Sequence, residues 1–184
     1  RRGSYAAYID IAHPEIEEFI NMRKTTGGDL NRKCLNLHNA VNITNKFLEA
    51  VAADEEWRLI DPKTNTAVKI VSARDLWFQI IQARVETGEP YIVNIDTCNE
   101  ALPEEQKKLG LEIKQSNLCS EITLPTNEER TAVCCLSSVN LEYFDTWSTN
   151  EDFISDLVTM LDNVLDSFIT SVEGKGGYSK AAYS

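Results

Sequence analysis

The sequence predicts an α/β fold in which mainly parallel strands are covered by helices. Short apolar stretches such as Tyr5–Ile11 and Tyr91–Ile95 are typical of buried strands. They alternate along the chain with helical patterns of about ten or more residues, which favours parallel pairing because each crossover needs a helix. We expect roughly three long helices and five or six strands, too few for a closed barrel but suited to part of one.

The first part of the chain should form a loop, a strand, a helix and two further strands. Residues 1–4 read as a loop before the strand at Tyr5–Ile11. Pro14 suits the first turn of a helix, where its missing N–H costs least, and Gly27 with Gly28 should end that helix. Alternating apolar residues predict short strands at Leu35–Leu37 and Val41–Ile43.

The middle of the chain contains two helices with recognisable ends. Thr44 or Asn45 can cap a short helix, and Ala67–Val71 is a plausible strand. Ser72, followed three residues later by an aspartate, resembles a capping box at the start of a longer helix. Gly88 is a natural end for that helix.

The last helix has the clearest pattern in the chain. Pro103 should begin a short helix before it, and two segments rich in small polar residues and cysteine follow at 115–124 and 132–141. Thr149 or Asn150 can then cap the long helix. Its apolar residues recur at every fourth position: Phe153, Leu157, Leu161, Leu165 and Ile169. We expect this stripe to be core.

The composition excludes several classes of protein. With 29 acidic and 18 basic residues in 184, the formal charge is −11. A nucleic-acid polymer or an anionic membrane would favour a basic patch instead. No apolar run approaches the roughly 20 residues of a membrane helix, and the N-terminus lacks a signal-peptide core, so we expect a cytoplasmic protein. Because the first residue is arginine, we expect a processed chain or a piece of a longer one. We expect no internal domain boundary over 1–184.

The five cysteines do not form a metal-binding pattern. No CxxC occurs, and the two histidines, His13 and His38, are 25 residues apart, so zinc has little support. His38, flanked by apolar residues, reads as a hydrogen-bonded structural histidine. Cys134 and Cys135 are adjacent, with Cα atoms about 3.8 Å apart, which is too close for an unstrained disulfide. Both are compatible with simple core packing.

Asn117, Cys119 and Glu121 form the one constellation suited to chemistry. Their spacing of two places all three on one face if the segment is extended. A thiol can act as nucleophile or one-electron carrier, a carboxylate as general base, and an amide can orient a hydroxyl. The alternative is an edge strand with a buried, unreactive Cys119 between solvated polar residues.

The motif around these residues resembles that of a known family. Ser116–Ile122, with the sequence SNLCSEI, is similar to the finger-loop signature of the large, catalytic subunit of class I ribonucleotide reductase. The resemblance continues in Arg1–Ser4 followed by His13, in Thr87–Asn99, and in Cys134–Leu141, so it covers essentially the whole chain in the family's order.

The resemblance implies a role for each matching residue. Cys119 would hold the thiyl radical that abstracts the ribose 3′ hydrogen. Glu121 would accept the proton of the 3′ hydroxyl, and Asn117 would hydrogen-bond the ribose hydroxyls. Cys134 matches one member of the redox dithiol that reduces the 2′ position, whereas Cys135 matches a variable position. The partner of Cys134 would lie on an earlier strand that is missing here.

The resemblance also implies effectors and partners. Arg1, Arg2 and Gly3 match the loop that couples a bound dNTP or ATP effector to the choice of base. The segment itself would bind no metal or cofactor, because a metal-containing small subunit supplies the radical. The substrate would be a ribonucleoside diphosphate, the reductant thioredoxin or glutaredoxin, and the large subunits would form a homodimer.

The family's fold is a ten-stranded α/β barrel of two half-barrels, of which this chain would form the middle. On this interpretation the isolated 184 residues are inactive. Two alternatives stay open. One is a relative that makes the same thiyl radical with cobalamin or a glycyl radical. The other is a non-catalytic or split-gene nucleotide-binding fragment.

Overall fold

The computed structural model describes residues 2–173 and confirms the α/β class. In chain order the elements are β1 (Ala6–Asp10), α1 (Ile16–Asn21), η1 (Leu30–Arg32), β2 (His38–Ile43), α2 (Asn45–Ala53), β3 (Glu56–Asp61), β4 (Thr66–Ser72), α3 (Ala73–Thr87), β5 (Tyr91–Asn94), α4 (Ile95–Glu100), α5 (Glu104–Lys108), η2 (Leu141–Tyr143), α6 (Phe144–Trp147) and α7 (Phe153–Val172). The chain divides into two compact units, Arg1–Leu124 and Pro125–Ser184.

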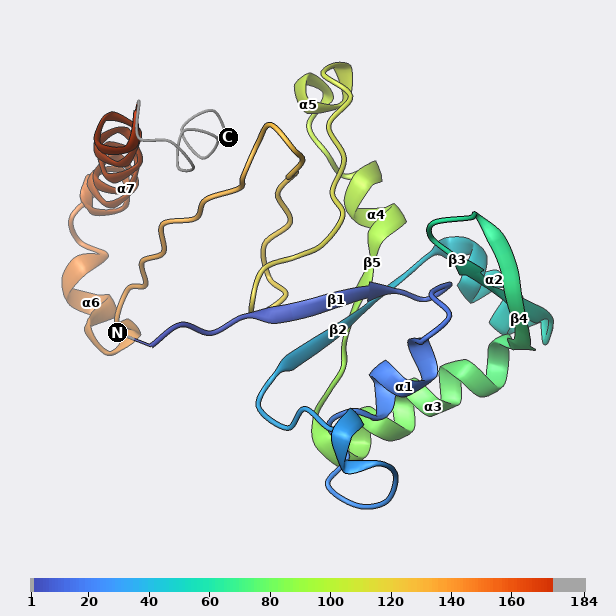
Figure 1. Ribbon diagram of the computed structural model, residues 1–184. Coiled ribbons are helices and arrows are strands. Elements are labelled where there is room, and N and C mark those ends of the chain that lie inside the picture. Colours follow the sequence, from blue (N-terminus) through green and yellow to red (C-terminus); the bar gives the residue numbers. More distant parts are fainter. Residues whose placement is uncertain (1, 174–184) are drawn as a thin grey trace. The chain divides into compact units, whose positions relative to one another are not determined.

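The first unit contains the predicted parallel sheet, with strand order β1-β2-β5. Tyr8 of β1 pairs with Ala40 of β2, and Val41 of β2 pairs with Ile92 of β5. Figure 1 shows α1 and α3 on one side of this sheet. Within the described residues the sheets are small and no barrel is closed.

The start of α2 and both ends of α3 follow the predicted caps. Thr44 Oγ1 accepts a hydrogen bond of 3.1 Å from the Phe47 N–H at the start of α2. Ser72 Oγ accepts 3.1 Å from the Asp75 N–H at the start of α3. Gly88 ends α3 with a φ of 81°, the left-handed conformation that glycine adopts without strain.

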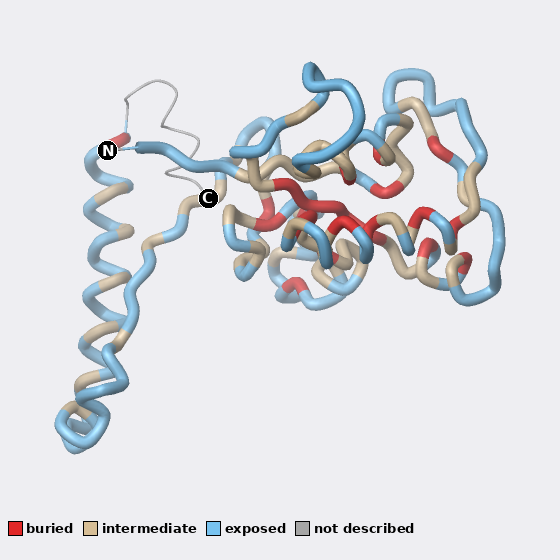
Figure 2. Tube along the Cα trace, turned by 90° about the horizontal axis from the view of Figure 1, so that it is seen from below, coloured by how far each residue is buried: buried red, intermediate tan, exposed pale blue. Residues whose placement is uncertain are grey.

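One hydrophobic core lies between the sheet and the three helices α1, α2 and α3. Phe47 of α2 is fully buried and packs edge-on against Trp57 and Trp77, with ring centroids 5.1 and 6.4 Å apart. Val41 and Ile43 of β2 face the same cluster, so the intervening Asn42 faces the other side of the sheet. Figure 2 shows the buried residues concentrated along these strands and helices.

The antiparallel hairpin β3–β4 was only half predicted. The strand over 67–71 is present, but its partner Glu56–Asp61 was not expected. In the segment EWRLID the charged residues are at 56, 58 and 61, so polar and apolar residues alternate over only four positions, and one side chain, Leu59, is fully buried. The strand forms because its backbone pairs with β4, from Glu56↔Ser72 to Asp61↔Thr66. The sequence pattern does not reveal this pairing.

Two boundaries near the N-terminus were also wrong. The helix expected to run to Gly27 ends at Asn21, because the chain turns back and Cys34 N–H bonds the Met22 carbonyl oxygen at 3.0 Å. Leu35–Leu37 forms a turn rather than a strand, and β2 begins at His38. Tertiary contacts therefore override the local pattern over this stretch.

The second unit consists of η2, α6 and the 20-residue helix α7. The predicted apolar stripe is present, but Phe153, Leu157 and Leu161 are only half-buried, and Ile154 and Val158 are exposed. The expectation that it forms core is thus wrong for the described part of the second unit, which contains no strand for the helix to cover. The cap differs as well, since α7 begins after Asp152 without a side-chain capping bond. No described helix combines the length and apolarity that crossing a membrane requires.

Candidate functional site

Asn117, Cys119 and Glu121 lie on a tight turn. The Asn117 N–H bonds the Ile122 carbonyl oxygen at 3.2 Å, and the Ser120 N–H bonds the Asn117 carbonyl oxygen at 3.2 Å. Ser120 has a φ of 67°, which reverses the chain. The prediction of an extended segment with three side chains on one face is therefore wrong. The residues come together because the chain folds back on itself.

The Asn117 side chain closes this turn. Its Oδ1 accepts hydrogen bonds from the Glu121 N–H at 3.0 Å and the Ile122 N–H at 3.2 Å. Its Nδ2 donates to Glu121 Oε1 at 2.7 Å. The buried Ser116 adds a hydrogen bond of 2.6 Å from its Oγ to the Ile122 carbonyl oxygen. These contacts fix the carboxylate of Glu121 relative to the backbone.

The turn presents reactive groups outward. Cys119 and Glu121 are both exposed, and Cys119 is a free thiol. The alternative in which Cys119 is buried is therefore wrong for the described residues. A thiol beside an oriented carboxylate can carry out hydrogen or proton transfer to a bound molecule.

Side chains from three elements hold the segment that leads into the turn. Asn99 of α4 bonds both the N–H and the carbonyl oxygen of Ile113, at 2.8 and 2.9 Å. Asn42 of β2 donates from Nδ2 to the Lys114 carbonyl oxygen at 2.9 Å. Tyr8 of β1 donates from its hydroxyl to the Asn117 carbonyl oxygen at 2.5 Å. Together they fasten the segment to the sheet face opposite the helices.

Sequence reasoning missed these anchoring residues. Tyr8 was counted within an apolar strand, where a tyrosine gives no separate signal. Asn42 did carry one, because an amide inside the apolar strand AVNI must find hydrogen-bond partners. Its partners lie 72 residues away at Lys114 and on the neighbouring strand at Asp10, so the pattern alone could not name them.

Tyr91 of β5 lies within electrostatic reach of Cys119. Burial raises the pKa of the Tyr91 hydroxyl, and negative charge on Glu89, Cys119 and Tyr8 raises it further. Tyr91 therefore stays protonated at neutral pH. It presents a neutral phenol on the side of the sheet where the turn lies.

The other predicted site residues, Cys134 and Arg1 to Gly3, do not belong to the turn. Cys134 belongs to the second unit and is exposed, whereas the neighbouring Cys135 is half-buried, and both are free thiols. Arg2 and Gly3 lie in an exposed irregular segment before β1. Arg1 lies outside the described residues.

The remaining titratable side chains indicate structure rather than catalysis. His38 Nδ1 lies 2.6 Å from Glu89 Oε1, which confirms its interpretation as a hydrogen-bonded structural histidine. Burial raises the pKa of the Cys98 thiol on α4. Among residues 2–173, no group of three histidine, cysteine, aspartate or glutamate side chains is arranged to hold a metal ion.

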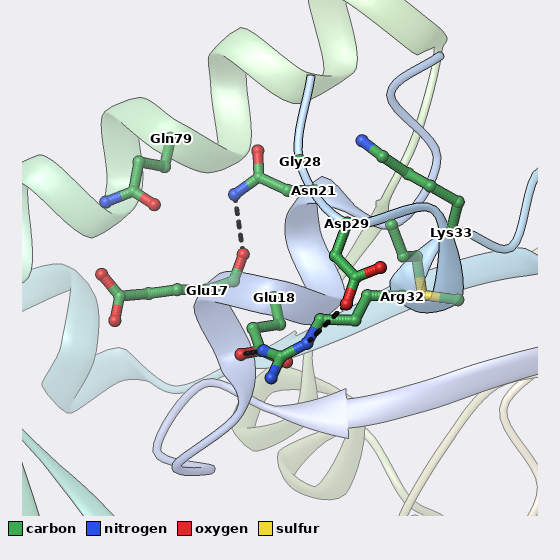
Figure 3. Close-up of a pocket in the computed structure, with 9 residues that line it drawn as sticks. Glu17, Glu18, Asn21, Gly28, Asp29, Arg32, Lys33 and Gln79 are labelled. Atoms are coloured by element: carbon green, nitrogen blue, oxygen red, sulfur yellow. Dashed lines mark hydrogen bonds and ion pairs between the residues drawn. The ribbon is translucent and has the colours of Figure 1, made fainter. Parts of the chain in front are cut away.

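A charged pocket lies between α1, α3 and the segment around η1, as Figure 3 shows. Arg32 forms ion pairs with Glu18 and Asp29, and Glu17 pairs with Lys69 of β4. These ion pairs neutralise much of the charge, and the described lining contains no cysteine, serine, threonine or histidine, so the pocket offers less chemistry than the turn.

A second pocket opens at the carboxyl ends of the parallel strands, a common place for ligands in α/β sheets. Asp10, Asn42 and Asp96 contribute to its lining, and the Oδ1 atom of Asn42 has no hydrogen-bond partner within the described residues. None of the predicted site residues that the structure describes lines this pocket, although Ile113 and Lys114 of the segment that leads into the turn do.

Comparisons with known proteins agree on one family. Residues 1–177 match the family model described as "Ribonucleotide reductase, barrel domain". The chain is 55% identical, over 92% of its length, to the putative ribonucleoside-diphosphate reductase large subunit of Frog virus 3, of which it covers 30%. It is 45% identical, again over 92% of its length, to the large subunit of Invertebrate iridescent virus 3, of which it covers 35%.

A solved structure gives the same result. The chain superposes on the Actinobacillus ureae class Id ribonucleotide reductase alpha subunit with a TM-score of 0.77 and 31% identity. The match covers 98% of this chain and 31% of that protein. The chain thus spans about a third of the length of these three relatives.

Proposed function

The chain belongs to the ribonucleotide reductase large-subunit family, in which it matches the barrel domain, and we propose that the whole protein reduces ribonucleoside diphosphates to deoxyribonucleotides. The observation that supports this most directly is the turn in which Asn117 holds the Glu121 carboxylate two residues after Cys119. Radical chemistry on a sugar needs a thiol and a base held in a fixed relation to it, which such a turn supplies.

The proposed reaction replaces the 2′ hydroxyl of the ribose by hydrogen. Cys119, as a thiyl radical, takes the 3′ hydrogen, and Glu121 accepts the proton of the 3′ hydroxyl. A dithiol that includes Cys134 supplies two electrons and two protons, one proton to the 2′ hydroxyl, which leaves as water, and one to C2′, and it becomes a disulfide. Glu121 returns its proton to the 3′ oxygen. Cys119 then returns a hydrogen to the 3′ carbon. One ribonucleotide and one dithiol thus give one deoxyribonucleotide, one water and one disulfide.

Asn117 can act on both the enzyme and the substrate. Its Oδ1 is engaged by two backbone N–H groups, and one Nδ2 hydrogen is donated to Glu121. The amide has a second Nδ2 hydrogen. We propose that this hydrogen binds a ribose hydroxyl, so that one side chain aligns the sugar with the base.

The reaction requires groups from outside this chain. The radical would come from a separate, metal-containing small subunit, and thioredoxin or glutaredoxin would regenerate the dithiol. Cys134 would pair with a cysteine on another strand of the whole protein, because adjacent Cys135 is too close for an unstrained disulfide. The isolated 184 residues would not turn over.

Regulation would act at the N-terminal segment. We propose that Arg1, Arg2 and Gly3 belong to the loop through which dNTP or ATP effectors select the base, in a homodimer of large subunits in the cytoplasm. The exposure of Arg2 and Gly3 supports such a role, since both lie free to contact another segment or a nucleotide.

The fold proposed for the whole protein is a ten-stranded barrel of two half-barrels. The parallel order β1-β2-β5, with helices on one face and the Cys119 turn on the other, supports its assignment to one half. Both compact units would belong to this single domain, with the rest of the barrel covering the apolar side chains that α7 exposes.

The decisive experiment measures deoxyribonucleotide formation by the full-length protein with its small subunit. Cys119→Ala should abolish turnover, whereas Cys34→Ala, which removes another exposed free thiol, should leave it unchanged. Substantial activity in Cys119→Ala would refute the assignment. Activity that requires added cobalamin and no small subunit would indicate the cobalamin-dependent alternative. Absence of any reduction by the wild type would favour the non-catalytic one.

A further inference from the structure

We propose that Tyr8 is a positioning residue for the Cys119 turn, acting through the backbone of Asn117. This inference rests on the proposed function, in which the turn carries the reactive thiol. It goes beyond that function because nothing in the Ser116–Ile122 motif points to a tyrosine more than a hundred residues earlier in the chain.

Tyr8 is the anchor that reaches the turn itself. The other two anchoring side chains, Asn99 and Asn42, bind at Ile113 and Lys114, before the turn begins. The Tyr8 hydroxyl donates instead to the carbonyl oxygen of Asn117, the first residue of the turn, at 2.5 Å. It therefore fixes the peptide plane from which the chain reverses.

The acceptor of this bond has a second function within the turn. The Asn117 carbonyl oxygen also accepts the Ser120 N–H, which closes the loop around Cys119. The Asn117 side chain in turn orients the Glu121 carboxylate. A shift of the Asn117 peptide would therefore move the thiol and the base together.

The strand that carries Tyr8 makes it a rigid support. Tyr8 lies in the middle of β1 and pairs with Ala40 of the central strand β2, and its flanking residue Ile9 packs against the hydrophobic core. A hydroxyl fixed on a strand positions a loop more accurately than one on another loop. The core thus supports the first residue of the turn through the hydrogen bond from the Tyr8 hydroxyl to the Asn117 carbonyl oxygen.

Tyr8→Phe in the full-length protein tests this directly, because it removes the hydroxyl and keeps the ring. We expect kcat to fall about 3- to 10-fold, the effect of one hydrogen bond, with KM and the thermal midpoint unchanged. Tyr143→Phe is the matched control, since Tyr143 is exposed, lies in the second unit and should keep wild-type kcat. An unchanged kcat in Tyr8→Phe would overturn the proposal. So would a loss of kcat accompanied by a lower thermal midpoint or a higher KM, which would indicate packing or substrate binding instead.

A second measurement separates this inference from the proposed function. Hydrogen exchange of the Ser120 amide reports closure of the turn without requiring turnover. Tyr8→Phe should accelerate that exchange about 3- to 10-fold, while Tyr143→Phe should not. Equal exchange in the two variants would refute the role of Tyr8 even in an active enzyme. A wild type without reductase activity would refute the function and leave this result standing.

Discussion

The Asn117 amide nitrogen donates a hydrogen bond of 2.7 Å to the Glu121 carboxylate across a four-residue turn. The same side chain accepts the backbone N–H groups of Glu121 and Ile122 through its oxygen. The two halves of the amide can therefore be tested separately. Replacement by aspartate keeps the acceptor that closes the turn but removes the donor that holds the base.

We predict that Asn117→Asp lowers kcat of the full-length protein about 10- to 100-fold at pH 7. The donor that holds the Glu121 carboxylate is lost, and the new carboxylate repels it. The base should therefore leave the position from which it acts on the substrate.

Asn127→Asp is the control for this substitution. Asn127 Oδ1 accepts the Glu129 N–H at 2.9 Å in an exposed turn, so the change to aspartate keeps a similar backbone contact. Its kcat should match that of the wild type. An unchanged kcat in Asn117→Asp would show that Asn117 does not position Glu121.

Cys134→Ser should stop repeated turnover supported by thioredoxin, because the proposed dithiol can no longer form a disulfide. Cys135→Ser, at the adjacent position, should sustain cycling at the wild-type rate. The measurement is the number of deoxyribonucleotides formed per active site over several minutes with excess reductant. Continued cycling by Cys134→Ser would contradict its assignment to the dithiol.

The sequence predicts best those helices whose ends are defined by a capping side chain or by a glycine. The caps at Thr44 and Ser72 and the stop at Gly88 depend on contacts within a few residues, so the pattern contained them. The strand Glu56–Asp61 was missed because its stability comes from a partner strand and not from its own alternation. The stripe of α7 was read correctly as apolar, but its burial depends on what surrounds it.

The sequence motif names residues for the candidate site, and their role stays a prediction, but it does not give their geometry. The motif named Asn117, Cys119 and Glu121, yet the extended segment inferred from their spacing is a turn. Periodicity cannot reveal a reversal that depends on a left-handed Ser120 and on a hydroxyl from Tyr8. Such contacts between distant positions become visible only once the chain is folded.

Cys98 should be a poor nucleophile in the folded protein. Burial raises the pKa of its thiol above the ordinary value of 9.0, so less thiolate is present at any given pH. The rate of iodoacetamide labelling at Cys98, followed by peptide mass spectrometry, should reach its midpoint above pH 9.0. The same measurement in urea removes the burial and should bring the midpoint back down. Equal midpoints in the two states would show that burial does not control this thiol.

Glu89 should stabilise the sheet more than its neighbour Glu86. Its carboxylate is 5% exposed and bonds the Asn39 N–H at 3.1 Å, with Arg23 Nε at 3.4 Å and His38 Nδ1 at 2.6 Å. Glu89→Ala would leave these donors without their acceptor, at a cost of about 2 kcal/mol or more.

Hydrogen exchange in the full-length protein measures this cost where it arises. The amides of β2 should exchange roughly 30-fold faster in Glu89→Ala. Glu86→Ala is the control, because Glu86 pairs with Lys24 at the surface, where screening by water leaves an ion pair little to contribute. We expect its exchange to resemble that of the wild type. If both variants accelerate exchange equally, then general loss of negative charge, and not the buried network around Glu89, accounts for the stability of β2.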